Sequence, residues 1–249
     1  MRVVCSEALH SSTIYTNILK ENTIEKNMLN RMFVGFALAL TFYGISLAAA
    51  GGAMNWQWTF GTGTADQPPP GFTFSRTGSG RQGTWVIKKD DQAPSGAYVL
   101  AQIDTDNTSY RFPIAVANEP MLRDLRLSVR CKPVAGKVDQ ACGVVFRYRD
   151  ENNYYVARAN ALEDNVRFYH VSSGKRSELA SWSGKVSSGS WHELRVDAIS
   201  DHVQVFWDGQ KVIDARDKTF NESGKIGLWT KADSVTYFDD LTVEAQEGR

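Results

Sequence analysis

The chain has 249 residues with 28 basic and 28 acidic side chains, so its formal net charge at pH 7 is zero. A balanced charge creates no overall field that attracts nucleic acid or anionic lipid, so the composition gives a nucleic-acid partner no support. About 200 residues remain after the N-terminal leader described next, which is enough for one domain with a substantial core.

Residues 28–50 have the pattern of a secretory signal peptide. Arg31 lies in its basic region, FVGFALALTFYGISL is its apolar run, and three consecutive alanines supply a small-residue cleavage site. The apolar run is too short for a convincing membrane span, so we expect no transmembrane anchor after cleavage. We interpret residues 1–27 as a mis-assigned upstream extension, because the signal peptide begins with a methionine of its own. The mature chain, residues 51–249, is then a single domain in the periplasm or outside the cell.

Short strands separated by turn signals fill the mature chain. Clusters of Pro, Gly, Asn, Asp and Ser recur at the spacing typical of all-β domains. We expect strands at residues 84–88, 98–103, 111–116, 125–131 and 143–149. No segment of the mature chain has a convincing helical pattern. About a dozen short strands in one domain favour two packed antiparallel sheets arranged as a jelly roll.

Two cysteines remain in the mature chain, since Cys5 lies in the expected upstream extension. Cys131 and Cys142 flank a turn-like segment, so adjacent strands could place them opposite each other. In an oxidising compartment this arrangement predicts a disulfide, and the alternative is two partly buried thiols.

The segment GVVFRYRDENNYYVARANALEDNVRFYHV predicts two hairpins with four-residue loops at 150–153 and 162–165. The expected cross-strand pairs are Arg149 with Tyr154, Arg147 with Val156, Val145 with Arg158, Asn160 with Arg167, and Arg158 with Tyr169. One face of these strands is then a core layer of Val144, Phe146, Tyr148, Tyr155, Ala157, Ala159, Val166 and Phe168. The opposite face displays Arg147, Arg149, Tyr154, Arg158, Asn160, Arg167 and Tyr169.

That second face has the groups that hold hydroxyl-rich or acidic ligands. Aromatic rings stack on the apolar faces of sugars, while Arg and Asn bond hydroxyls or a carboxylate. The alternative is a solvated sheet face whose arginines pair with nearby carboxylates. Four arginines with few acidic partners on the face favour a binding surface. Glu163, in the connecting loop, is either a rim ligand or a turn residue.

The last part of the mature chain alternates apolar and polar residues through several further strands. Asp208 and Gly209 supply the positive φ that a two-residue hairpin turn requires. Leu228 has the inward parity of its strand, which leaves Trp229 and Lys231 on the opposite face. An outward Trp229 is either a platform for a sugar ring or the cover of a loop.

The order of WHELRV, VQVFWDG, GKIGLWT and FDDLTV resembles the concanavalin A-like lectin/glucanase superfamily. Within it, the chain is similar to laminin-G-like jelly rolls and to secreted bacterial 3-keto-disaccharide hydrolase-like domains. Residues 141–148, ACGVVFRY, resemble a strand of the latter that ends in an apolar pair, an aromatic residue and Arg. The resemblance covers residues 56–243. It implies a jelly-roll fold and is compatible with a lectin, an enzyme or an adhesive module.

Asp239 and Asp240 are adjacent, so on a regular strand they would point to opposite faces. Phe238 and Leu241 differ in parity, which predicts a β-bulge if both belong to the core. The resemblance implies that a carboxylate at such a kink can bind a structural calcium ion, and Asp239 or Asp240 would be the ligand. Capping of local backbone amides is the simpler alternative.

The carboxylate motif of laminarinase-type members, E-x-D-x-E or E-x-D-x-x-E, does not occur in the sequence. Glycoside cleavage is therefore implied by the resemblance alone, with Glu163 and Asp239 as candidate acid or base. We expect a lectin-like domain that binds a glycan or glycoconjugate and needs no cofactor apart from the calcium just described. A glycoside hydrolase and a laminin-G-like protein-interaction module are the alternatives.

Overall fold

The computed structural model describes residues 54–247, which form strands and no helix. This part of the chain thus contains no helix long and apolar enough to cross a membrane. The strands are β1 (Asn55–Trp58), β2 (Phe72–Gly78), β3 (Trp85–Lys89), β4 (Tyr98–Gln102), β5 (Arg111–Ala117), β6 (Leu125–Ala135), β7 (Ala141–Asp150), β8 (Asn153–Asn160), β9 (Asn165–Ser172), β10 (Lys175–Ser183), β11 (His192–Ile199), β12 (His202–Trp207), β13 (Gln210–Arg216), β14 (Lys225–Trp229) and β15 (Val235–Ala245). The expected upstream extension and signal peptide, residues 1–50, lie outside the described residues.

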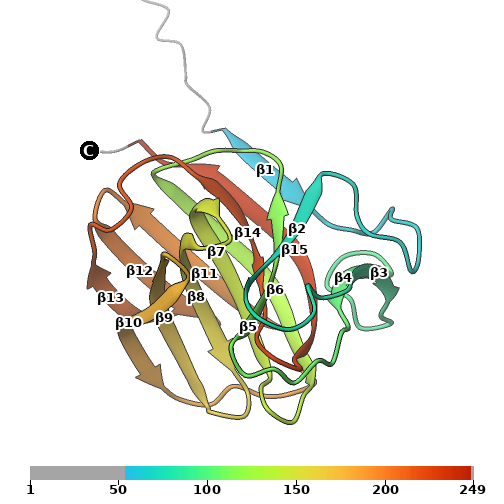
Figure 1. Ribbon diagram of the computed structural model, residues 1–249. Coiled ribbons are helices and arrows are strands. Elements are labelled where there is room, and N and C mark those ends of the chain that lie inside the picture. The colour runs from blue at the N-terminus through green and yellow to red at the C-terminus, as the bar shows by residue number, and fades with distance from the viewer. Residues whose placement is uncertain (1–53, 248–249) are drawn as a thin grey trace, which may run out of the picture. The chain divides into compact units, whose positions relative to one another are not determined.

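The strands form two antiparallel sheets, shown in Figure 1. The first sheet has the order β13-β12-β11-β6-β15-β4-β3, and β1 pairs with β15 beside this path. The second sheet has the order β10-β9-β8-β7-β14-β5-β2. The chain changes sheets repeatedly, for example from β5 to β6 and again from β6 to β7. This architecture confirms the expected two-sheet jelly roll.

Alternation of apolar and polar residues explains why each strand buries one side. Along β11, Leu194, Val196 and Ala198 are fully buried, while the residues between them remain partly exposed. The turn between β12 and β13 has φ values of 47° at Asp208 and 81° at Gly209, as a two-residue hairpin turn requires. The predicted hairpin is therefore confirmed.

The core lies between the sheets and is rich in aromatic side chains. Phe74 of β2 stacks on Trp85 of β3 across the sandwich, with ring centroids 6.4 Å apart. Burial of one large apolar side chain stabilises the fold by roughly 1.5–3 kcal/mol, so this layer is the main source of stability. The predicted core layer is confirmed for Val144, Phe146, Tyr155, Ala157, Ala159, Val166 and Phe168.

A disulfide joins the two sheets. Cys131 on β6 belongs to the first sheet and Cys142 on β7 to the second, and their Cα atoms are 6.3 Å apart. The expectation that the two cysteines lie opposite each other on paired strands is wrong, because the segment between them carries the chain from one sheet to the other. The bridge consequently crosses the core, where both cysteines are fully buried.

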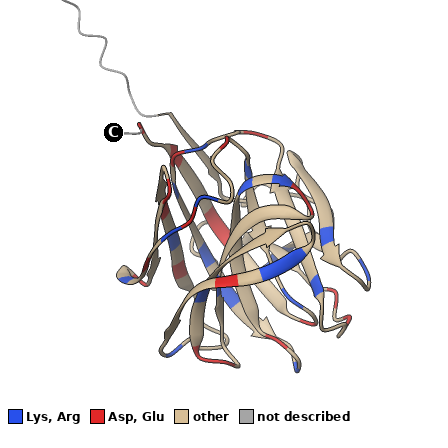
Figure 2. Ribbon diagram, turned by 60° about the vertical axis from the view of Figure 1, so that its left-hand side comes forward, with Lys and Arg blue, Asp and Glu red and all other residues tan. Residues whose placement is uncertain are grey.

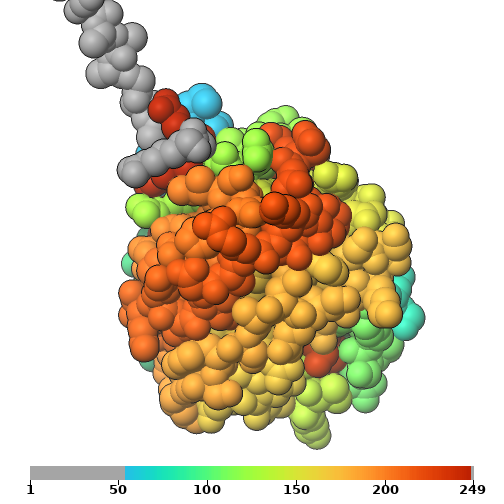
Figure 3. Space-filling view, turned by 90° about the vertical axis from the view of Figure 1, so that its left-hand side faces the viewer, coloured from blue at the N-terminus to red at the C-terminus, as the bar shows by residue number. Residues whose placement is uncertain are grey.

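The edge strands β10 and β13 lie against each other although they belong to different sheets. Figure 3 shows their segments, in yellow-orange and orange, side by side at the surface. The sandwich is therefore closed along this side.

Candidate functional site

The second sheet is strongly curved, and its side away from the core is concave. In the sheet order β5 and β10 are five steps apart, which is roughly 24 Å in a flat sheet. The guanidinium of Arg176 on β10 nevertheless lies 4.6 Å from the ring centroid of Phe112 on β5. The backbone amide of Arg176 also donates to the hydroxyl of Tyr110, just before β5, at 2.8 Å. Only a curled sheet brings these strands so close.

Arg158 and Arg167 lie directly opposite each other on β8 and β9. The predicted pairing of Asn160 with Arg167 is wrong by two residues, because Asn160 pairs with Asn165. Since side chains alternate with a period of two, a shift of two residues leaves every side chain on its own face. The structure thus brings Arg158, Asn160, Arg167 and Tyr169 to one face despite the error in pairing.

A bulge in β7 separates Arg147 and Arg149 from this face. The register between β7 and β8 shifts there, and Arg147 has a φ of 47°. Its buried guanidinium donates instead to the carbonyl oxygens of Arg123, Phe220 and Ser200. Arg149 lies over the ring of Phe220. The grouping of these two arginines with the binding face is therefore wrong, because parity alone does not reveal a bulge.

The same bulge moves Tyr148 from the predicted core to the concave side. Its ring lies 5.8 Å from that of Tyr154, and its hydroxyl lies 3.0 Å from Ser75 Oγ. Beyond the bulge Val145 pairs with Val156 rather than with the predicted arginine. The turn between β7 and β8 has two residues instead of four.

Arg158 is the centre of an ion cluster on the concave side. Its side chain is 1% exposed, and its Nη1 donates to Asn165 Oδ1. Its Nη2 donates to Glu163 Oε2 at 2.9 Å and to the hydroxyl of Tyr169 at 3.1 Å. The acidic partner that the sequence left undecided is therefore Glu163. The ion pair between Arg158 and Glu163 also weakens the expectation that the arginines of this face have few acidic partners.

Asp139 forms a second buried part of the cluster. Its carboxylate is fully buried and accepts hydrogen bonds from Asn160 Nδ2 and Lys231 Nζ. Its backbone amide donates to Asp233 Oδ1 at 3.0 Å, which fixes the loop before β7. Lys231, predicted to lie outside the core, thus reaches this face and remains 16% exposed.

The accessible rim consists of Glu163, Arg167 and Glu178, whose side chains are 37%, 35% and 41% exposed. Arg167 Nη1 lies 3.0 Å from Glu178 Oε2. In Figure 2 basic and acidic positions alternate over the strands, with no broad region of one sign. We call the whole set the arginine face: Asp139, Arg158, Asn160, Glu163, Arg167, Tyr169, Arg176, Glu178, Trp229 and Lys231.

Two carboxyl groups of the arginine face have pKa values shifted in opposite directions. Burial raises the pKa of Asp139, and the hydrogen bond and charge of Lys231 only partly offset it. Burial also acts to raise the pKa of Glu163, but the charge of Arg158 and hydrogen bonds from Asn165 and Arg158 outweigh it and lower the pKa below its usual value. The site thus stabilises the charge of the accessible Glu163, whereas burial opposes the charge that Asp139 carries opposite Lys231.

An aromatic layer underlies the arginine face. Trp229 and Tyr154 are fully buried, and Tyr169 is 4% exposed. The guanidinium of Arg176 covers two of these rings, lying 4.4 Å from the ring centroid of Tyr169 and 5.9 Å from that of Trp229. Trp229 does lie on the opposite side from Leu228, as predicted. Its interpretation as an exposed sugar platform is wrong, because Arg176 and Phe112 cover it.

Sequence reasoning missed Arg176, Glu178 and Asp139. The first two could have been found, because the β9–β10 pairing places Arg176 opposite Val171 and Glu178 opposite Tyr169. Extending the parity of β9 across its short turn would have placed both on the arginine face. Asp139 lies in a loop, where no periodic signal exists.

Asp239 lies apart from Glu163, on the first sheet, so these two predicted acid or base candidates do not form a pair. The predicted bulge is confirmed, since the register of β15 shifts after Asp239 and Asp240 has a φ of 45°. Asp239 Oδ2 accepts the backbone amide of Ser95 at 2.9 Å, and Oδ1 accepts the amide of Asp240 at 2.9 Å. Within residues 54–247 no group of three or more acidic, His or Cys side chains is placed to hold a metal ion. The contacts of Asp239 fit amide capping, and calcium binding stays a prediction.

Residues 77–244 match the model of the family described as 3-keto-alpha-glucoside-1,2-lyase-like domain. Levanase of Bacillus subtilis (strain 168) is 24% identical over 169 residues, which are 66% of this chain and 22% of the levanase. The chain thus spans about a fifth of the length of that relative.

Solved structures share the fold. Carbohydrate binding module CBM66 from Bacillus subtilis has a TM-score of 0.57 and 22% identity, covering 70% of this chain and 96% of the module. The cellulose-induced protein Cip1 has a TM-score of 0.56 and 10% identity, covering 78% and 99%. A Bacillus subtilis protein with a galectin-like fold has a TM-score of 0.51 and 11% identity, covering 72% and 90%. At these identities the likeness concerns the fold alone.

Proposed function

Because this chain belongs to the 3-keto-alpha-glucoside-1,2-lyase-like domain family, we propose that it is a carbohydrate-binding domain that holds a glycan at the arginine face. One observation carries the proposal: the ions of Arg158 and Asp139 are buried beneath an accessible rim. Burying an ion costs several kcal/mol even when it is paired, so stability alone gives no reason to keep them. Their use is to hold the rim groups in fixed positions.

The rim offers both kinds of hydrogen-bonding group. Glu163 accepts hydrogen bonds from sugar hydroxyls, whereas Arg167 donates to hydroxyl or carboxylate oxygens. Tyr154, Tyr169 and Trp229 are buried and support the face from below, so recognition depends on hydrogen bonds rather than on ring stacking. The carbohydrate-related names of the levanase and of CBM66 agree with this ligand class.

The proposal includes export to the periplasm or beyond the cell. Its basis is the signal-peptide pattern of residues 28–50, together with a buried disulfide, a feature of oxidising compartments. Sequencing the N-terminus of protein recovered from the cytoplasm, the periplasm and the medium tests this: cleavage near Gly51 supports export, and protein found only in the cytoplasm with residues 28–50 intact contradicts it.

A glycan array with the purified protein tests the binding function. The variant carries Glu163→Gln and Arg167→Ala, because both side chains are about one-third exposed, and glutamine keeps a side-chain oxygen that accepts from Arg158. The matched control carries Arg126→Ala and Asp197→Asn, an ion pair on the outward face of the first sheet. We expect binding that the first variant loses and the control keeps. Equal binding by both variants, or no binding at all, would favour the protein-interaction alternative instead.

A second candidate function is cleavage of a 3-keto-glycoside at the same face. Family membership and the raised pKa of the buried Asp139 beside Lys231 favour it. The hydrogen on C2 of such a sugar is acidic because it is next to the ketone, and the accessible carboxylate of Glu163 is the group placed to remove it. The electron pair left on C2 then forms a C1–C2 double bond as the bond from C1 to the leaving oxygen breaks, and this oxygen takes up a proton from water to give the alcohol. Incubation with methyl 3-keto-α-glucoside should release methanol, and Glu163→Gln should abolish the release; no release by the wild type rejects this function.

A further inference from the structure

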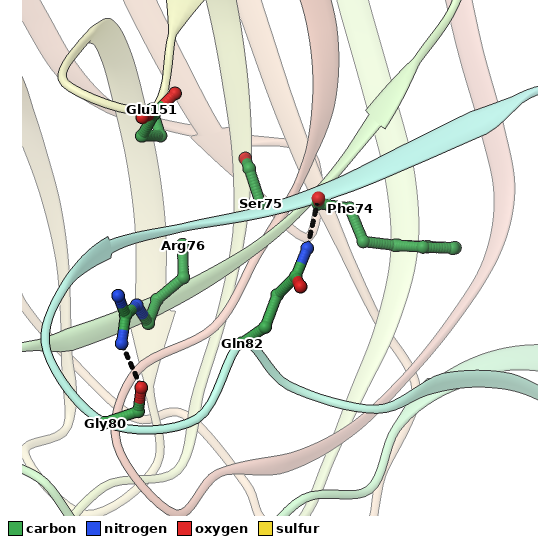
Figure 4. A pocket seen from close by; sticks show the side chains of 6 residues that line it. All are labelled: Phe74, Ser75, Arg76, Gly80, Gln82 and Glu151. Carbon is green, nitrogen blue, oxygen red and sulfur yellow. Dashed lines mark hydrogen bonds between the residues drawn. The ribbon is translucent and has the colours of Figure 1, made fainter.

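A polar pocket lies outside the arginine face, along the edge of the second sheet (Figure 4). It has a volume of about 360 Å³ and is lined by Phe74, Ser75, Arg76, Gly80, Gln82 and Glu151. These residues come from the edge strand β2, the loop after it and the tip of the β7–β8 hairpin. In the sheet order β2 is four steps from β8, but the curl of the sheet brings Thr77 of β2 within 2.7 Å of Tyr154 on β8, so the pocket is separated from the arginine face by its lining residues and not by the width of the sheet.

The loop after β2 forms one wall and is held by an ion network. The amide of Arg81 donates to Asp106 Oδ2 at 2.6 Å, and its guanidinium makes two bonds to Asp104 at 2.7 and 2.9 Å. The fully buried Arg111 donates from Nε to the carbonyl oxygen of Arg81 at 2.7 Å. These contacts fix the wall before any ligand arrives, which lowers the entropy cost of binding.

The hairpin tip forms the opposite wall and is tied to β2 by hydroxyl groups. Thr77 Oγ1 donates to the carbonyl oxygen of Glu151 and lies 2.7 Å from the hydroxyl of Tyr154. Ser75 Oγ lies 3.0 Å from the hydroxyl of Tyr148. Both walls are therefore anchored to the same edge strand.

The pocket brings a cationic donor and an anionic acceptor to the same small space. Arg76 donates through Nη1 to the carbonyl oxygen of Gly80, and Gln82 donates to that of Phe74, as the dashed lines in Figure 4 mark. Arg76 Nε is buried and has no hydrogen-bond partner among residues 54–247, an unfavourable state for an N–H group. The Glu151 carboxylate accepts hydrogen bonds only. A ligand hydroxyl both donates and accepts, so it suits this combination.

We propose that this pocket is a second glycan subsite that binds a neutral, hydroxyl-rich saccharide unit independently of the arginine face. A neutral unit fits because Arg76 and Glu151 carry opposite charges, so an anion attracted by one is repelled by the other. The ligand class rests on the proposed function. No residue that lines the pocket belongs to the arginine face.

NMR titration of the ¹⁵N-labelled protein with methyl α-glucoside, methyl β-galactoside and sucrose, each added separately, tests the subsite. We expect saturable shifts of the backbone amide signals of Gly80, Gln82 and Glu151 with at least one sugar. Arg76→Gln should weaken this binding about tenfold or more, as expected for loss of a charged hydrogen-bond donor. Arg216→Gln, on an exposed arginine of β13, is the control and should leave the binding unchanged.

The outcomes separate the two sites. Shifts at the pocket that persist in the Glu163→Gln, Arg167→Ala variant and vanish in Arg76→Gln support the subsite, whether or not the arginine face binds. Saturable shifts confined to the arginine face reject the subsite and leave the proposed function standing. An Arg76→Gln protein with a dispersed spectrum and unchanged pocket shifts also rejects the subsite, and the absence of shifts anywhere counts against both.

Discussion

The outward faces of the two sheets carry similar charged side chains but place them in different surroundings. On the first sheet, Arg126 contacts Asp197 through two bonds of 3.0 Å and remains 46% exposed. On the second sheet, Arg158 contacts Glu163 at 2.9 Å but is 1% exposed. The difference comes from the curl of the second sheet, which moves charges of its concave side out of water. The alternation of charged residues along a strand therefore does not reveal whether their ion pairs are exposed to solvent or buried.

The largest expected effect is the difference in stability loss between two variants, each of which breaks the ion pair of one face. Arg158→Met should lower the free energy of unfolding by about 3 kcal/mol, the low end for breaking a buried pair, because Glu163 stays partly hydrated. Arg126→Met should cost about 1 kcal/mol or less, as for exposed pairs. Urea unfolding followed by circular dichroism measures both. Equal losses in the two variants would contradict the contrast between the faces.

The disulfide tests whether the two sheets act as one cooperative unit. The Cys131→Ala, Cys142→Ala double variant should lose about 2–3 kcal/mol, because the bridge closes a loop with a sequence separation of 11 and thereby restricts the unfolded chain. A single unfolding transition should remain in the calorimeter. Wild-type protein treated with a reductant should show the same decrease; two separate transitions would mean that the sheets unfold independently.

Turn glycines provide a smaller contrast between the sheets. Gly209 (φ 81°) and Gly174 (φ 75°) both have left-handed backbones, so replacement by alanine should cost about 1 kcal/mol at each. A Cβ at Gly174 would also lie 2.9 Å from Asn152 Oδ1, whereas nothing lies within 4 Å of a Cβ at Gly209. Thermal unfolding should therefore show a lower midpoint for Gly174→Ala than for Gly209→Ala. The reverse order would mean that the second-sheet turn relaxes freely.

The smallest effect concerns acid stability. In the folded protein the charge of Arg158 and hydrogen bonds outweigh burial and lower the pKa of Glu163. The ionised carboxylate thus contributes stability that is fully present above the unfolded pKa, about 4.3, and is lost as the pH falls through the folded value. Glu163→Gln should lose less stability than wild type between about pH 5 and about pH 3. Urea titrations at these pH values check this, with Glu244→Gln on β15 as control; a steeper loss in Glu163→Gln would reverse the assigned sign.

Local signals predicted most of the fold. Turn signals delimited the strand at residues 111–116, observed as Arg111–Ala117, and residue type identified the turn at Asp208. Each of these two signals depends only on residues that are adjacent in the sequence. They can therefore be read without knowing which strand pairs with which. The same holds for the β8–β9 face, where an error of two residues in pairing changed no side chain's direction.

Errors arose where the outcome depends on distant segments. Arg147 leaves the face because a bulge lets it donate hydrogen bonds to three carbonyl oxygens on other segments of the chain. No local sequence pattern predicts those acceptors. Trp229 has the predicted direction but is buried, because the curl of the sheet brings Arg176 over it. The residues of the site were thus partly predictable, whereas their burial was not.

The contact between β10 and β13 has a consequence for solubility. A free sheet edge presents unpaired backbone groups to other chains and is a starting point for aggregation. Here one edge of each sheet lies against the other, so the two edges shield each other from strand addition. Substitutions that weaken the contact between β10 and β13 should therefore increase aggregation even when the arrangement of the arginine face is unchanged.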